Sequence, residues 1–240
     1  MNKPPLYKQS LKDVLSDFFN VVMHHKNVQQ SSFLNAMVEI YHHQSISNEI
    51  CAFALDDDST TAAINLLKEQ IKKQTTASFN MLNSPLTYLF DELICNIQQH
   101  AQVDKGYAYA EFNPATNTIN IIIADWGVTI YGSYVAAQKH LDKLGNSDAE
   151  ALNLAQNGYS VKNLPNAENR GYGISSNINM IVNGLHGEFA TLSGNALMLH
   201  SAGKRQILDL PSEVDFKGTM VLVSFPIDVP NDFNLYKYTS

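Results

Sequence analysis

Hydrophobic residues in the first third of the chain recur every three or four positions, the period of an amphipathic helix. Two such stripes precede residue 50, one made of Leu11, Val14, Leu15, Phe18, Phe19 and Val22 and the other of Phe33, Ala36, Met37, Ile40 and Tyr41. The Asp, Ser and Thr residues at 56–61 can cap a third helix over 62–74. The short apolar run at 50–55 fits either a strand or a buried helix.

The pattern changes at residue 84. Ser84-Pro85 is a favourable helix start, with serine as the cap and proline in the first turn, and predicts a helix over 86–101. Two apolar segments flanking the turn-rich NPATN predict a hairpin. A long polar region over 131–170 contains one helix-like stretch at 148–155, and a second helix begins near Gly173. The predicted strands are 107–112, 118–125, 195–201, 205–210 and 219–227.

Helices and hairpin strands are segregated along the chain, which predicts an α/β fold: a two-layer sandwich on a mixed, mostly antiparallel sheet. We divide the chain into a mainly helical N-terminal segment, 1–83, and a domain over 84–240. The apolar stripes of the segment need burial. They can dock on the domain of the same chain, dimerise with a second copy or bind a protein partner.

The composition narrows the location and the partners. With 45% hydrophobic and 16% charged residues, the 240-residue chain is typical of a soluble globular protein, and its net charge of −7 disfavours broad binding of nucleic acid or acidic membranes. It has no apolar run of about 18 residues that could span a membrane and no secretion signal. Cys51 and Cys95 lack the spacing of a metal or redox pair. We therefore expect a cytoplasmic location.

Two familiar kinds of site are disfavoured. No GxxxxGK[ST] loop is present, so a P-loop is excluded. The histidines at 24–25 and 42–43 form adjacent pairs, whose side chains point about 100° apart on a helix. Neither pair is a natural chelate, because metal-binding helices usually place histidines four residues apart.

The helix over 86–101 carries the first candidate site. Glu92, Asn96 and His100 follow one another at four-residue spacing and share one face, opposite an apolar stripe. A solvated helix face is one explanation. The other is chemical, because an asparagine amide oxygen can bind Mg²⁺ and a glutamate can act as a general base.

Two further segments place polar groups at the ends of elements. Asp125 ends an apolar strand and is followed by Trp126-Gly127, so its carboxylate can accept a hydrogen bond from an exocyclic amine such as adenine N6. A simple turn that closes a strand is the alternative. Gly171 and Gly173 open an apolar helix, whose N-terminal N–H groups favour phosphate, and Arg170 adds a positive charge beside them. A flexible loop is the alternative there.

The order of these segments resembles the GHKL (histidine-kinase-like) ATPase superfamily. The resemblance rests on DELICNIQQHA, DWGVTI, RGYGIS and KGTMVLVSFP, in that order, over roughly residues 84–227. The family includes histidine kinases, anti-sigma-factor kinases, mismatch-repair ATPases, type II topoisomerase subunits and heat-shock chaperones. This chain looks most like the stand-alone bacterial ATP-binding regulators among them.

The resemblance implies a Bergerat-type fold that holds Mg-ATP between a helix and a lid, here about 131–170. It implies that Glu92 is the general base, Asn96 the Mg²⁺ ligand and Asp125 the carboxylate that reads adenine. The other residues of the implied nucleotide site are His100, Gly127, Arg170, Gly171, Gly173 and Thr219. Two positions depart from the family pattern, Trp126 in place of asparagine and Thr129 in place of a second glycine. A positive φ at Thr129 would cost about 1 kcal/mol or more.

Three functions fit these expectations. The first is an enzyme that transfers the γ-phosphate to a protein partner or to water. The second is a nucleotide-gated interaction module that does not hydrolyse ATP, and the third is an interaction domain with a degenerate pocket. A complete sensor histidine kinase is not expected, because neither histidine pair is followed by the acidic and basic residues and the proline of a phospho-accepting helix.

Overall fold

The computed structural model describes residues 51–75, 79–161, 172–210 and 216–239. The two stripes before residue 50, the histidine pairs, Arg170 and Gly171 therefore lie outside the described residues. The strands are β1 (Cys51–Ala54), β2 (Lys105–Asn113), β3 (Thr118–Asp125), β4 (Glu188–Gly194), β5 (Ala196–Ser201), β6 (Lys204–Asp209) and β7 (Phe216–Pro226). The helices are α3 (Asp57–Thr75), α4 (Phe79–His100), α5 (Ile130–Ala137), α6 (Leu141–Leu144), α7 (Asp148–Gln156), α8 (Tyr172–Asn179), the π-helix η2 (Met180–Gly184) and α9 (Tyr236–Thr239).

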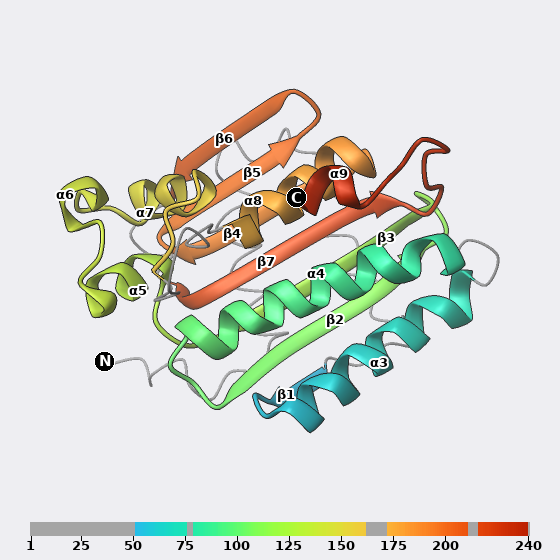
Figure 1. Cartoon of the computed structure of the whole chain (residues 1–240), viewed down its shortest axis with the longest axis horizontal. Coiled ribbons are helices and arrows are strands. Elements are labelled where there is room, and N and C mark those ends of the chain that lie inside the picture. The colour runs from blue at the N-terminus through green and yellow to red at the C-terminus, as the bar shows by residue number, and fades with distance from the viewer. Residues whose placement is uncertain (1–50, 76–78, 162–171, 211–215, 240) are drawn as a thin grey trace.

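The strands form one sheet in the order β1-β2-β3-β7-β4-β5-β6 (Figure 1). Each of the described pairings is antiparallel, so the predicted α/β class with a mostly antiparallel sheet is confirmed, and the described strands contain no parallel pair. The arrangement is compatible with the predicted two-layer sandwich. The central strand β7 lies between β3 and β4, which joins the first hairpin to the later strands. Asp125 pairs with Thr219 across β3 and β7, so the candidate carboxylate, at the end of β3, lies beside the first part of the closing strand β7.

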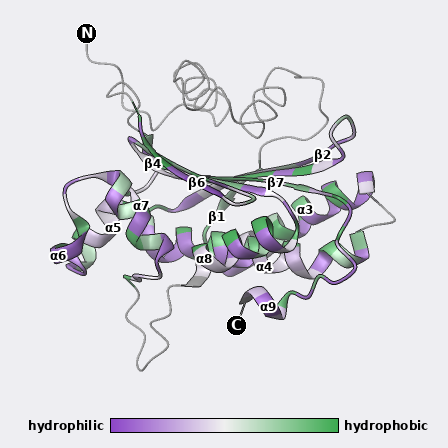
Figure 2. Cartoon of the chain, turned by 90° about the horizontal axis from the view of Figure 1, so that it is seen from above, coloured by the Kyte–Doolittle hydropathy of each residue, from purple (hydrophilic) through white to green (hydrophobic). Residues whose placement is uncertain are grey.

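The described helices lie on one face of the sheet (Figure 2). Helix α3 buries Ala63, Leu67 and Ile71 at four-residue spacing, and α4 buries an apolar stripe that runs along its whole length. These stripes share one core with the sheet residues that point toward the helices, among them Ala108, Ile121, Ile123, Phe189, Val221 and Val223. The helical layer thereby fixes the position of α4 over β3 and β7.

The N-terminal boundary of α4 differs from the prediction. The helix begins at Phe79, and Ser84-Pro85 lies inside it. The reason is packing: Phe79 and Leu82, both before the proline, are buried in the core and continue the apolar stripe by more than one turn. The predicted domain boundary at 83/84 falls within this helix. The ambiguous run at 50–55 contains strand β1, which pairs with β2.

The described part of the polar region, up to residue 161, contains more structure than predicted. Helix α7 coincides with the predicted stretch at 148–155, whereas α5 and α6 were not predicted. Together they enclose a small separate core of Tyr134, Leu144, Ala151 and Leu154. Strand β4 was also missed. Among the described helices, none combines the length and the apolar character needed to cross a membrane.

Candidate functional site

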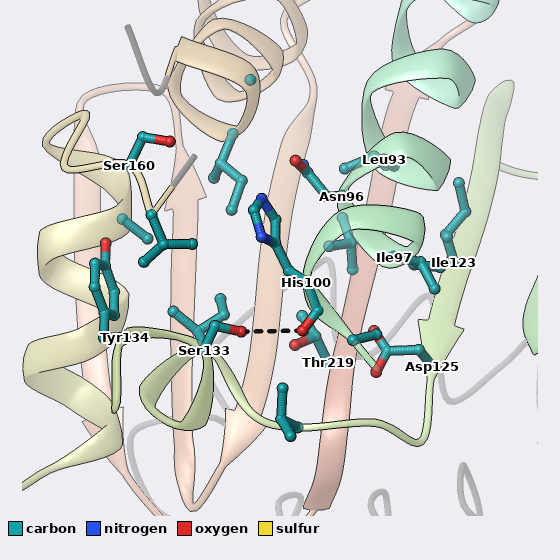
Figure 3. Close-up of a pocket in the computed structure, with 18 of the residues that line it drawn as sticks. Leu93, Asn96, Ile97, His100, Ile123, Asp125, Ser133, Tyr134, Ser160 and Thr219 are labelled. Atoms are coloured by element: carbon teal, nitrogen blue, oxygen red, sulfur yellow. Dashed lines mark hydrogen bonds between the residues drawn. The ribbon is translucent and has the colours of Figure 1, made fainter. Parts of the chain in front are cut away.

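A cavity lies between α4, the end of β3, the start of α5 and the start of α8. It is lined by Leu93, Asn96, Ile97, His100, Ala101, Ile123, Asp125, Val128, Ile130, Ser133, Tyr134, Ala155, Tyr159, Ser160, Val161, Gly173, Ile174, Thr219 and Val221. Most of these side chains are apolar, and a few polar groups converge on the space, as in small-molecule sites. Figure 3 shows Asp125 and Thr219 at one end of the cavity and Asn96 at the other, with the His100 ring between them.

Asp125 occupies the closed end of the cavity. Its side chain is only 3% exposed, and its Oδ1 accepts a hydrogen bond of 2.8 Å from the backbone N–H of Gly127. Burial raises the pKa of Asp125 from 3.8 to about 7, although the backbone N–H groups of Gly127 and Thr219 lower it. The carboxyl group therefore changes charge near neutral pH, and a ligand that donates a hydrogen bond to it favours the ionised form.

The turn after β3 is held tightly against the end of α4. The backbone N–H of Val128 donates to the Ala101 carbonyl at 2.9 Å. A Cβ atom at Gly127 would lie 1.8 Å from that same carbonyl oxygen, so the close approach requires glycine. The glycine after Asp125 thus has a packing reason, in addition to the hydrogen bond that its N–H donates to the carboxylate.

Thr129 fits the turn without strain. Its φ is −66°, in the ordinary extended region, and its Oγ1 accepts a hydrogen bond of 3.0 Å from Gly132 as the N-cap of α5. The positive φ that would have made threonine costly is absent at this position. Trp126 packs edge-on against Tyr107, with ring centroids 4.1 Å apart. Both departures from the family pattern therefore have a structural role in this chain.

Ser193 supports the same end of the cavity and was missed by the sequence analysis. Its Oγ accepts a hydrogen bond of 2.8 Å from the Ile130 N–H and donates one of 3.1 Å to the Gly218 carbonyl. Gly218 has φ +118°, and a Cβ there would lie 2.2 Å from the Asp125 carbonyl oxygen. One buried serine thus joins β4 to the turn and to the start of β7, next to Thr219. Gly218-Thr219 belonged to a quoted motif, whereas Ser193 was not singled out as a site residue.

The open end of the cavity is formed by α4 and α8. Asn96 and His100 line it from α4, both half-buried, and Gly173 lines it from α8. Glu92 is not a lining residue but lies next to Gly173: a Cβ at 173 would be 2.6 Å from Glu92 Oε2 and 3.7 Å from Asn96 Nδ2. The structure therefore brings together Glu92, Asn96 and Gly173 from helices that are far apart in sequence.

Polar groups on α8 lie close to this contact. The Asn177 Nδ2 donates to the Gly173 carbonyl at 2.9 Å, inside the first turns of the helix. Burial raises the pKa of Tyr88 on α4, while a hydrogen bond with Ser176 on α8 lowers it. The hydrogen bond between Tyr88 and Ser176 thus connects the two helices in addition to apolar packing.

The charge of the described lining limits how it can hold phosphate. Its described residues include no lysine or arginine, and the described residues contain no cluster of three or more histidine, cysteine, aspartate or glutamate side chains that could bind a metal. A site that depends on several protein carboxylates for its metal is therefore not formed by these residues. Mg²⁺ does not need one, because it usually keeps water ligands and binds through one or two protein oxygens plus substrate phosphates.

The sequence-predicted residues thus divide into two groups. Asn96, His100, Asp125, Gly173 and Thr219 line the cavity, whereas Glu92 lies beside the lining residue Gly173 and Gly127 donates a hydrogen bond to Asp125. Arg170 and Gly171 lie outside the described residues. In comparisons with known proteins, no family model matches the chain, and no curated protein is significantly similar to it.

Proposed function

We propose that this chain is a Mg-ATP-binding protein of the histidine-kinase-like (GHKL) type, with a Bergerat-type fold. One observation carries the proposal. A buried carboxyl at a strand end, an asparagine on a helix face and a glycine at a helix start all line the same cavity. These are Asp125, Asn96 and Gly173. They come from three separate segments, and the cavity between them is largely apolar.

Asp125 would recognise the adenine base. Its ionised carboxylate accepts a hydrogen bond from an exocyclic amine such as adenine N6, and the apolar walls cover the faces of the ring. Guanine presents a carbonyl oxygen at the equivalent position, which would face a carboxylate with no hydrogen between them. The site should therefore prefer adenine to guanine nucleotides.

Asn96 and Glu92 would act at the phosphates. The Asn96 amide oxygen is a suitable Mg²⁺ ligand, and the metal neutralises phosphate charge when it is bound. Glu92 would accept the proton of the attacking water or hydroxyl, since its carboxylate lies beside Gly173 at the same end of the cavity. In this reading the protein transfers the γ-phosphate to water or to a protein partner in bacterial regulation.

The second candidate is a nucleotide-gated interaction module without hydrolysis. It is supported by the lack of lysine and arginine among the described lining residues, because such cations stabilise a transferring phosphoryl group. In that case ATP would order residues around the cavity and change a surface for a partner.

Calorimetric titration with a non-hydrolysable ATP analogue and Mg²⁺ tests nucleotide binding. We expect saturable binding that weakens at least tenfold, about 1.4 kcal/mol, in Asn96→Ala and on replacement of the adenine by guanine. Asn80→Ala, on an exposed position of the same helix, is the matched control and should bind like the wild type. No binding at millimolar nucleotide would refute the proposal.

Phosphate release separates the two candidates. If Glu92→Gln keeps its affinity and loses phosphate release, whereas Glu69→Gln keeps both, the enzyme is supported. Glu69 is a suitable control because its ion pair with Lys72 is exposed. If the wild type releases no phosphate, with or without candidate acceptor proteins, the interaction module is supported.

A further inference from the structure

The face of the sheet opposite the described helices is largely apolar. Paired residues share a face, so the strand registers define two rows that cross β3, β7, β4 and β5. The rows are Ile122–Leu222–Ala190–Leu199 and Ala124–Met220–Leu192–Leu197. Figure 2 shows the described helices on the other side, so none of the described helices covers these rows. We call this patch the second face.

The second face does not have the character of a solvated surface. Leu192, Met220 and Leu222 are 0% exposed, and Ile122 is 2% exposed. A monomeric protein rarely leaves so contiguous an apolar patch in water. A face of this composition therefore needs a cover that the described helices do not provide.

A buried carboxyl at the edge of the second face points to the same conclusion. Glu111 on β2 is 0% exposed; its Oε2 accepts a hydrogen bond of 2.8 Å from the Tyr109 hydroxyl, and its Oε1 accepts one of 3.4 Å from Asn120. Burial raises the pKa of this carboxyl. On an open sheet face this side chain would reach water, so the cover extends to β2.

We propose that residues 1–50 of the same chain cover the second face. This segment carries two apolar stripes, at 11–22 and 33–41, which predict two amphipathic helices with no apolar partner of their own. The second face is an apolar surface without a described partner. One contact within the chain would therefore bury both surfaces at once.

The dimensions agree. Four neighbouring strands span roughly 14 Å at about 4.8 Å per strand. Two helices packed side by side lie about 8–10 Å apart and together cover a strip of roughly this width. The stretch 42–50 can extend up to about 30 Å before the chain enters β1, which is an edge strand separated from β3 only by β2. The second stripe can therefore reach the middle of the sheet.

A second copy of the chain is the competing cover. Two sheets packed face to face through this patch would bury the second face but leave the stripes at 11–22 and 33–41 without a partner. The tethered segment has a further advantage, since its effective concentration at the face is in the millimolar range. The proposal does not depend on nucleotide binding, because the cavity opens on the helical side of the sheet.

Photo-methionine labelling of the full chain tests this contact without a destabilising substitution. Met220 lies on the second face and Met198 points into the core under the helices, and both are fully buried. On irradiation we expect cross-links from Met220 to peptides of residues 1–50, whereas Met198 should cross-link only to the helical layer. Met220→Leu should remove the first set and leave the second unchanged.

An equal mixture of isotope-labelled and unlabelled chains identifies the chain that makes the contact. Contact within one chain gives cross-linked peptides that are both heavy or both light. Mixed pairs at the level expected for random pairing would mean that a second copy covers the face, which would overturn the proposal. Met220 cross-links that avoid residues 1–50 altogether would overturn it as well.

Discussion

The two ends of the cavity are built in different ways. At the Asp125 end, polar groups are buried and hydrogen-bonded, and glycine backbones pack against other backbone atoms. At the Asn96 end, the side chains of Asn96, His100 and Glu92 are half-buried. The two ends therefore suit different tasks. The first end has the fixed geometry that recognition of a base requires. The second can adjust to phosphate, metal and an acceptor.

The largest expected effect is at Gly127. In Gly127→Ala the new methyl group meets the Ala101 carbonyl, a backbone atom at the end of α4 that cannot rotate away. We expect the free energy of unfolding to fall by about 4 kcal/mol, or folding to fail, since this clash exceeds ordinary overpacking. Chemical denaturation followed by circular dichroism measures it. A loss below about 1 kcal/mol would mean that the Asp125 end is not rigid.

The second prediction concerns the pH dependence of stability. Since burial raises the Asp125 pKa to about 7, the folded state keeps a proton that the unfolded state loses near pH 4. The free energy of unfolding should therefore fall as pH rises from about 4 to 7, by on the order of 3 kcal/mol.

Asp125→Asn should remove that component of the pH profile, whereas Asp142→Asn, at an exposed position of α6, should keep it. Denaturation curves at several pH values measure both variants. An unchanged profile in Asp125→Asn would show that this carboxyl does not titrate in the folded protein near neutrality. Nucleotide affinity, in turn, should decline below about pH 7 in the wild type, because a protonated carboxyl is a weaker hydrogen-bond acceptor than a carboxylate.

Ser193→Ala tests the support behind the turn. The substitution removes the bridge between the Ile130 N–H and the Gly218 carbonyl, and leaves the N–H without its partner. We expect a loss of about 1–2 kcal/mol in unfolding free energy. Ser201→Ala, on the neighbouring strand β5, is the control, and equal losses in the two variants would argue against a specific role for Ser193.

The smallest effect on stability is expected at Gly173, although its surroundings look equally crowded. There the new methyl group meets the end of the Glu92 side chain, which can rotate, and alanine is favoured over glycine in a helix. Stability should change by less than about 1 kcal/mol. If the proposed function holds, phosphate release should fall, because Glu92 would be displaced. A large loss of stability in Gly173→Ala would instead show that both ends of the cavity are rigid.

Local patterns predicted much of the fold. The strands β2, β3, β5, β6 and β7 were predicted from apolar runs and turn residues, and α7 as a helix-like stretch within a polar region. The start of α4 was not, because the local preference for Ser84-Pro85 is outweighed by the burial of Phe79 and Leu82. Strand β4 was missed as well; it is paired on both sides, with β5 and with β7, and the pairing with β7 joins segments that are distant in the chain.

The sequence by itself determined the chemistry that is available: a carboxylate after an apolar strand, a Glu–Asn–His row on one helix face and glycines before a second helix. It also determined that the first 50 residues carry apolar stripes that require a partner. These features depend on residue type and on spacing within one element, so they can be read locally.

Only the tertiary structure decided which of these groups meet. It buried Asp125, which raises the pKa of that carboxyl, and it placed Gly173 against Glu92. It also placed the Ser193 hydroxyl within hydrogen-bond distance of the Ile130 N–H, and it gave Thr129 an ordinary backbone conformation. It also left one face of the sheet without a described helix. Each of these depends on contacts between segments far apart in the chain. Desolvation and close packing arise from such contacts, and no local pattern contains them.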